Sequence, residues 1–144
     1  MSQAIRMTRA DERPLEAEIN VSRLRLRTFI GFNDDERRKR QDVVIDLLIR
    51  YRLRDGVLED EVSDALDYKV VTKAVIDLVE NGRFLLLEKL VADILGLCSN
   101  HPDVTYSRVT VDKPHALRFA DSVALTLDYR PGRADSTRRL EKAS

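Results

Sequence analysis

Residues 70–98 read VVTKAVIDLVENGRFLLLEKLVADILGLC, and this stretch decides the fold. Its apolar residues recur every three or four positions, which is the spacing of amphipathic helices with one buried face. The first stripe stops at Asn81-Gly82, a pair typical of a helix C-terminus, and the second ends before Pro102. The sequence therefore predicts two consecutive helices. Their apolar stripes are Val70, Val71, Ala74, Val75, Leu78 and Val79, then Leu87, Leu90, Val91, Ile94 and Cys98.

Strand-like runs flank the two helices, two before them and two after. Residues 19–30 and 43–53 precede the helices, and residues 104–112 and 123–129 follow them. Each run is rich in β-branched or alternating apolar residues. The order β-β-α-α-β-β predicts an α+β fold in which two helices cover one face of a four-stranded antiparallel sheet.

The first strand changes parity along its length. Ile19 and Val21 fall on odd positions, whereas Leu24 and Leu26 fall on even ones, so a bulge is expected near Ser22. The opposite face of this strand is basic and does not resemble a core. It carries Arg23, Arg25 and Arg27.

A sheet of this kind has two exposed edges and a polar second face. Closing several subunits edge to edge into a ring would bury both edges and leave a polar lumen. We therefore expect a ring-shaped homo-oligomer.

Composition and net charge limit the classes of protein to which this chain could belong. The chain has 144 residues, 43% hydrophobic and 35% charged, with zero formal net charge. These values fit a single folded domain, expected over residues 16–130, with flexible tails at 1–15 and 131–144. A neutral protein has no global attraction to nucleic acid or membrane, and the basic run Arg37–Arg40 follows three acids, as in a solvated loop. No apolar run is long enough to span a bilayer.

Cysteine and histidine are scarce. The only cysteine, Cys98, excludes an internal disulfide, lies on an apolar helix stripe and suits a reducing cytoplasm. Together with His101 and His115 it does not supply the spacing of a metal site. We expect a cytoplasmic protein that needs no metal.

Glu88 places one carboxylate near the start of an otherwise apolar helix. Such a group either complements the helix dipole or binds a ligand. Its two parallel acceptors match a ring edge that offers an N–H beside an exocyclic NH2, as pterins and guanines do.

Four short motifs appear in order along the chain. They are Gly31 with Glu36 and Gln41, then Asp64-Ala65-Leu66-Asp67-Tyr68, then Leu86-Leu87-Glu88, then Val111-Asp112-Lys113-Pro114. In this order and spacing they resemble the dihydroneopterin aldolase family of the tunnelling fold, and the resemblance spans residues 19–129.

The resemblance implies an enzyme that cleaves the C1′–C2′ bond of a reduced pterin side chain by a retro-aldol step, without cofactor. Glu88 would anchor the pterin ring, and the backbone N–H of Leu87 would donate to its 4-oxo group. Lys113 would act as the acid and base. From the residue alone, Lys113 could equally be a solvated strand-end lysine.

Three further roles follow from the same resemblance. Glu36 would bind the side-chain hydroxyls, although by itself it could be one charge of a solvated turn. Tyr68 would assist proton transfer from a neighbouring subunit, beside the backbone of Leu66, in a tetrameric ring stacked to an octamer. Without the family motif, Tyr68 could simply close the start of a helix.

Residues 24–31, 79–84 and 115–123 resemble the epimerase branch of the family, which acts on dihydroneopterin triphosphate. An epimerase must retain the cleaved aldehyde and add it back with inverted C2′, and basic residues could hold its phosphates. The candidates, between which the sequence does not choose, are Arg27, Arg37, Arg38, Lys39, Arg40, His115 and Arg118. Two alternatives stay open. One is the aldolase of folate biosynthesis, which releases glycolaldehyde, and the other is a non-catalytic pterin-binding ring.

Overall fold

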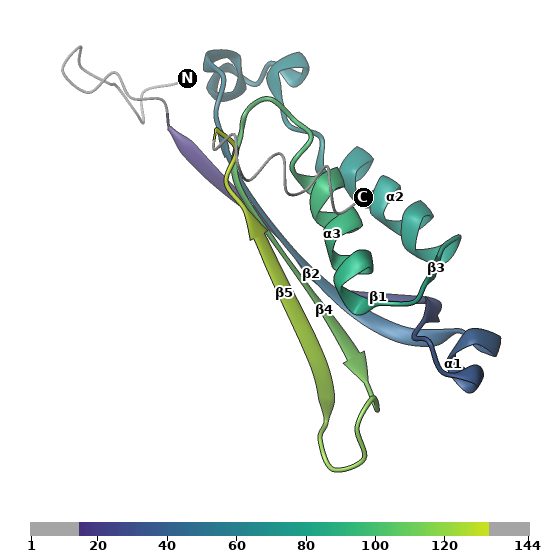
Figure 1. Ribbon diagram of the computed structural model, residues 1–144. Helices are drawn as coiled ribbons and strands as arrows, with labels where there is room; N and C mark the ends of the chain where they lie inside the picture. The colour runs from purple at the N-terminus through teal and green to yellow at the C-terminus, as the bar shows by residue number, and fades with distance from the viewer. Residues whose placement is uncertain (1–14, 133–144) are drawn as a thin grey trace.

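The computed structural model describes residues 15–132 (Figure 1). Residues 1–14 and 133–144 of the expected flexible tails lie outside the described residues. The strands are β1 (Glu16–Ile30), β2 (Gln41–Arg52), β3 (Arg83–Phe84), β4 (Val104–Pro114) and β5 (Ser122–Tyr129). The helices are α1 (Asp34–Arg38), α2 (Tyr68–Glu80) and α3 (Leu87–Cys98), with 3-10 turns at Asp55–Glu59 and Val62–Asp64.

The two predicted helices are confirmed as α2 and α3. Asp67 caps the start of helix α2, and its carboxylate accepts hydrogen bonds from the backbone N–H of Lys69 (3.0 Å) and Val70 (3.3 Å). Asn81 caps its end, as the Asn-Gly pair indicates. The longest helix among residues 15–132 has 13 residues, and none of them is long and apolar enough to cross a membrane.

The sheet differs from the expected four antiparallel strands. Within residues 15–132 it has five strands in the order β3-β1-β2-β4-β5, and β3 runs parallel to the end of β1. The β3 strand pairs only Arg83 with Phe29 and Phe84 with Ile30, so it is too short to show an alternating pattern. The solvated loop expected at Arg37–Arg40 is also wrong in part, because α1 covers Asp34–Arg38 and is capped by the side chain of Asn33.

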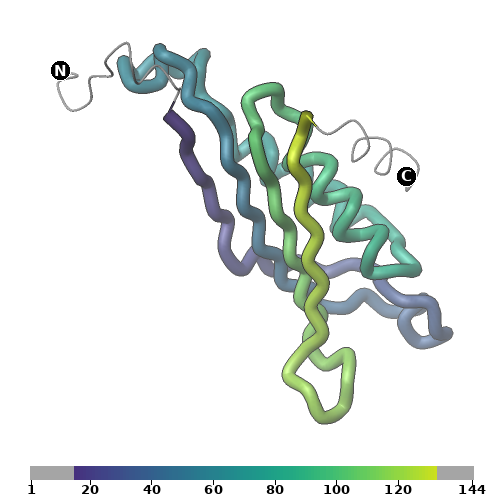
Figure 2. The backbone as a smooth tube through the Cα atoms, turned by 60° about the vertical axis from the view of Figure 1, so that its left-hand side comes forward, coloured from purple at the N-terminus to yellow at the C-terminus, as the bar shows by residue number. Residues whose placement is uncertain are grey.

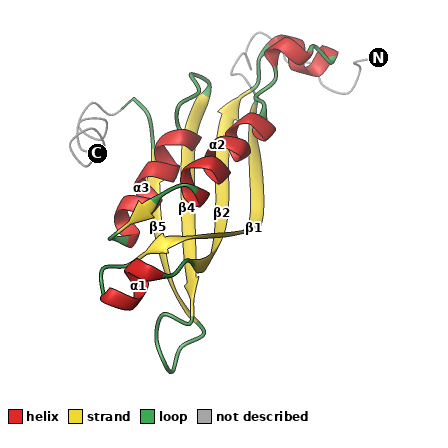
Figure 3. Ribbon diagram, turned by 90° about the vertical axis from the view of Figure 1, so that its right-hand side faces the viewer, coloured by secondary structure: helices red, strands yellow, loops and turns green. Residues whose placement is uncertain are grey.

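Helices α2 and α3 cover one face of the sheet (Figure 3). Their buried stripes meet the inward-facing residues of the strands in one core, and full burial of a Leu or Ile side chain contributes about 1.5–3 kcal/mol. The fully buried large side chains include Ile30, Ile45, Ile49, Leu90, Ile94 and Leu95.

The opposite face is polar, as the arginines of β1 predicted. Glu18 pairs with Arg50 at 3.0 Å, and the Arg50 guanidinium lies 4.9 Å from the centre of the Tyr106 ring. The Tyr106 hydroxyl donates to Asp128 at 2.9 Å. These contacts join β1, β2, β4 and β5 across the face without making a second apolar core.

The predicted bulge in β1 is confirmed. The register with β2 shifts between Val21 and Leu24, so β1 holds one residue more than its partner there. Arg23 has a φ of 58°, and its backbone N–H donates to the Asp46 carboxylate at 2.8 Å. The strand changes direction at this point, as the purple segment of Figure 2 shows.

Candidate active site

Glu36 and Lys113 form the central contact of the site, although 77 positions separate them in sequence. Glu36 lies on α1, and Lys113 lies near the end of β4. The Lys113 ammonium donates a short hydrogen bond to Glu36 Oε2. Their side chains are only 22% and 13% exposed, so the pair is largely shielded from water. The hydrogen bond from Lys113 lowers the pKa of Glu36 below its ordinary value, and partial desolvation opposes that effect.

The segment between β1 and β2 holds the Glu36 carboxylate in place. The Glu36 backbone N–H donates to the Asn33 side chain at 2.8 Å, which fixes the start of α1. The Gln41 amide donates to the Ile30 carbonyl at 2.6 Å and to Glu36 Oε2 at 3.5 Å. Gly31 lies directly beneath the carboxylate with a φ of 125°. The motif of Gly31, Glu36 and Gln41 is therefore one connected unit.

Gly31 is required there for two reasons. A φ of 125° is a conformation that residues with a Cβ rarely adopt. A Cβ built at this position would also overlap the carboxyl atoms of Glu36. Glycine therefore lets the backbone approach the Glu36 carboxylate closely.

Glu88 and Leu87 lie at the start of α3, on the same end of the molecule as α1 and the end of β4 (Figure 1). The short β3 strand fixes this placement, because Gly31 donates its N–H to the Phe84 carbonyl at 2.9 Å, just before α3 begins. Leu86 supplies no side-chain cap, so the first N–H groups of α3 stay open to a ligand. Within residues 15–132 the exposed Glu88 carboxylate makes no hydrogen bond or ion pair of its own.

Tyr68 and Leu66 lie elsewhere in the same chain, at the opposite end of α2. The C-terminal end of α2 is near the site, since Glu80 accepts a hydrogen bond from the backbone N–H of Arg27 at 2.6 Å. Tyr68 is the first residue of the helix, and 13 residues of α-helix span about 20 Å. One chain alone therefore does not bring Tyr68 to Glu36 and Lys113.

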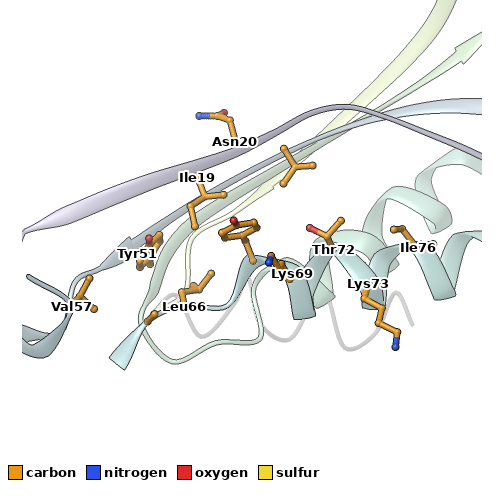
Figure 4. A pocket seen from close by; sticks show the side chains of 12 residues that line it. Ile19, Asn20, Tyr51, Val57, Leu66, Lys69, Thr72, Lys73 and Ile76 are labelled. Atoms are coloured by element: carbon orange, nitrogen blue, oxygen red, sulfur yellow. The ribbon is translucent and has the colours of Figure 1, made fainter. Parts of the chain in front are cut away.

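Tyr68 and Leu66 instead border an open cavity of about 820 Å³ beside β1 (Figure 4). Tyr68 is half exposed and Leu66 is buried at its floor. The walls are mainly apolar and include Ile19, Val21, Tyr51 and Ile76, with Lys69 and Lys73 from α2.

His115 and Arg118 lie in the hairpin between β4 and β5, just beyond Lys113. His115 has a φ of 62°, which turns the chain out of β4, and its N–H donates to the Asp121 carbonyl at 3.4 Å. Arg118 is exposed and its guanidinium lies 5.7 Å from the centre of the Phe119 ring. The hairpin therefore places both residues at the end of the molecule that carries Lys113.

Sequence reasoning missed two parts of this region. Asn33 was not singled out, although a side-chain amide three residues before an acid is a recognisable helix cap. Arg25 was noted only as part of a basic face, although its parity with Arg27 already placed both side chains together.

Comparison with known proteins adds three findings. The FolB family model, described as dihydroneopterin aldolase, matches residues 19–128. Dihydroneopterin triphosphate 2′-epimerases of Escherichia coli K12 and Pseudomonas aeruginosa are 48% and 50% identical over 114 residues, 79% of this chain and 95% and 93% of theirs. The crystal structure of E. coli dihydroneopterin aldolase in complex with neopterin is similar with a TM-score of 0.72 at 26% identity, covering 78% of this chain and 98% of that one.

Proposed function

The chain belongs to the dihydroneopterin aldolase family, and from this membership we propose that it is a dihydroneopterin triphosphate 2′-epimerase. It would convert 7,8-dihydroneopterin triphosphate to dihydromonapterin triphosphate. The observation that carries this choice is the identity of 48–50% to two epimerases, against 26% to the E. coli aldolase of known structure.

The reaction needs one bond broken and re-formed. A base removes the proton of the 2′-hydroxyl, the C1′–C2′ bond breaks, and its electrons pass into the C=N of the dihydropterin ring. C2′ becomes the aldehyde carbon of a fragment whose far end still carries the triphosphate. The aldehyde then turns its other face, the electron pair returns to C2′, and the acid form of the base protonates the new alkoxide. No external oxidant, reductant or metal enters this balance.

Glu36 and Lys113 are suited to the proton transfers. Because the two side chains touch, a hydroxyl bound by Glu36 lies within reach of the Lys113 amine. In its neutral amine form Lys113 would take the 2′-hydroxyl proton, and as the resulting ammonium it would return the proton after re-addition. Glu36 would hold the hydroxyls in line. A proton transfer by a positioned side chain contributes typically about 10²- to 10⁴-fold in rate.

Glu88 and Leu87 would hold the ring. The Glu88 carboxylate would accept from the ring N3–H and the 2-amino group, and the Leu87 N–H at the uncapped start of α3 would donate to the 4-oxo group. The helix dipole supports an electron-rich oxygen at this end. Removing one partner of such a charged pair costs about 2–5 kcal/mol of binding.

Tyr68 and Leu66 would come from a second subunit. The length of α2 separates them from Lys113 in one chain, so a site that contains all of these residues needs two chains. Within residues 15–132, β5 and the Glu16–Thr28 part of β1 each pair on one side only, which leaves two strand edges for neighbours. A closed ring joined at these edges, stacked in pairs as an octamer, would satisfy both observations.

The experiment is to incubate purified protein with dihydroneopterin triphosphate and, separately, with dihydroneopterin. The pterins are then oxidised, dephosphorylated and separated by chromatography. Monapterin as the main product from the triphosphate is the expected result. Mainly 6-hydroxymethylpterin from the unphosphorylated substrate would identify an aldolase. Binding of a pterin analogue without turnover would identify a non-catalytic ring.

A further inference from the structure

A second cavity, of about 340 Å³, is lined by the two residues that follow Lys113 in the sequence and by parts of β1 and β2. Its lining includes Arg25 and Arg27 of β1, Asp42 of β2, and Pro114 and His115 after Lys113. Arg25 pairs with Val44 and Arg27 with Asp42 across the ladder, so both arginines belong to the polar face of the sheet. The cavity is thus separate from the large apolar one beside Tyr68.

The charges that line this cavity favour an anion. Asp42 is its one carboxylate, and it lies 3.3 Å from the Arg27 guanidinium. Arg27 also donates to the Arg40 carbonyl at 3.1 Å, so two contacts hold its guanidinium at the cavity wall. Arg25 makes no ion pair or hydrogen bond through its side chain within residues 15–132. One guanidinium and the His115 imidazole are therefore left to meet a ligand.

Lys113 is followed directly by two cavity-lining residues, Pro114 at the end of β4 and His115 just beyond it. The ladder between β2 and β4 stops at Val44 and Asp112, and β4 leaves the sheet at His115. The ends of β2 and β4 therefore separate beside Lys113. From Lys113 to His115 is at most about 7 Å of extended chain. A substrate whose C2′ lies at Lys113 can direct the far end of its side chain through this gap.

The other basic residues of the region are less suited to that end of the substrate. Arg40 and Arg83 lie 5.5 Å and 3.8 Å from the centre of the Phe29 ring, and Arg118 lies over Phe119. These guanidinium groups stack on aromatic rings instead of converging on a cavity.

We propose that Arg25, Arg27 and His115 form the subsite that binds the triphosphate of the substrate and retains the cleaved aldehyde. This inference rests on the proposed function and deepens it, because retention distinguishes an epimerase from an aldolase. Guanidinium forks match phosphate oxygens in geometry and charge. Arg25 is the decisive member, since its charge is not already neutralised.

The kinetic test compares Arg25→Gln with Arg52→Gln, an exposed arginine at the far end of β2. In Arg25→Gln, we expect KM for dihydroneopterin triphosphate to rise about 10- to 100-fold, the loss typical of a hydrogen bond to a charged group. KM for unphosphorylated dihydroneopterin should stay unchanged, and Arg52→Gln should match the wild type with both substrates. An equal rise with both substrates, or no rise with either, would overturn the subsite.

A binding test separates this subsite from the proposed reaction. The chain has two histidines, so the imidazole NMR signals of His101 and His115 are assigned with one His101→Gln variant. Inorganic triphosphate should shift the His115 signal saturably in the wild type, and Arg25→Gln should abolish the shift. If the protein turns over neither pterin but the shift persists, the reaction fails and the subsite stands. If the shift is missing at millimolar triphosphate, or survives in Arg25→Gln, the subsite is wrong.

Discussion

Replacing Gly31 by alanine tests whether the backbone is built around the Glu36 carboxylate. The new Cβ would come closer to the carboxyl atoms than 3.0 Å, a separation that real Cβ atoms essentially never show. Residues with a Cβ at positive φ cost about 1–3 kcal/mol, and displacing Glu36 from Lys113 and Gln41 adds about 1–2 kcal/mol. We therefore expect a total loss of roughly 2–5 kcal/mol. At roughly 4 °C per kcal/mol, Tm should fall by roughly 8–20 °C.

Activity should fall as well, by about 100-fold in kcat/KM, because a misplacement near 1 Å is enough for such a loss. Gly96→Ala is the matched control. Gly96 lies on α3, and a Cβ built there would have no neighbour within 4 Å. The same change should therefore stabilise the protein by about 0.5–1 kcal/mol and leave kcat/KM unchanged. Thermal unfolding measures the change in stability of each variant, and the product assay measures the change in kcat/KM.

A double-variant cycle separates the two causes. In a Glu36→Ala background the overlap disappears, so Gly31→Ala should cost only the backbone part, about 1–3 kcal/mol. The interaction energy from the cycle should then be about 1–2 kcal/mol. An equal loss of stability in both backgrounds would refute the reasoning that the carboxylate is what Gly31 accommodates.

Three further predictions concern the titration, burial and assembly of the protein. Because the pKa of Glu36 is lowered from its ordinary 4.5 on folding, its ion pair stabilises the protein above that pH, and the stability gained is lost as the pH falls through the folded-state pKa. Unfolding of the wild type and Glu36→Gln from pH 7 to pH 3 should therefore converge at low pH, and a constant difference would contradict this. Burial raises the pKa of Cys98 to about 12, so a thiol reagent at pH 8 should modify it only after unfolding, and rapid native labelling would show an accessible thiol. Tyr68→Ala and Glu88→Ala should each be inactive alone, but unfolded together and refolded they should recover up to about a quarter of wild-type activity, because mixed interfaces restore intact sites. No recovery in mixed oligomers would place both residues in one chain's site.

The regular elements could be predicted because their sequence patterns are long. The stripes of α2 and α3 repeat over three turns, and the change of parity around Ser22 was enough to locate the bulge. By contrast, β3 has two residues, and α1 has five polar ones, so neither carries a period. Their existence depends on tertiary contacts, chiefly the hydrogen bond from Gly31 to Phe84.

The site residues could be proposed only through the family motifs. Glu36 and Lys113 are 77 positions apart, so no local sequence pattern indicates that their side chains are in contact. The position of Tyr68, an α2 length away from Lys113, follows from the direction of a helix relative to the sheet, which sequence periodicity does not define. The pairing of Arg25 and Arg27 with residues of β2 likewise requires the register of the ladder.

The extra residue in β1 lets one strand contribute side chains to two different regions of the molecule. Without it, the side chains before and after Ser22 would alternate out of phase, and either Ile19 and Val21 or Leu24 and Leu26 would point to the polar face. With it, a single strand turns a corner and still keeps all four in the core. Its first half can then form one wall of the cavity beside Tyr68, while its second half supplies Arg25 and Arg27 and ends at Ile30, just before Gly31. Deleting Ser22 would therefore shift one half of β1 against the other and disturb both regions at once, an effect that we do not expect from a substitution in either region alone.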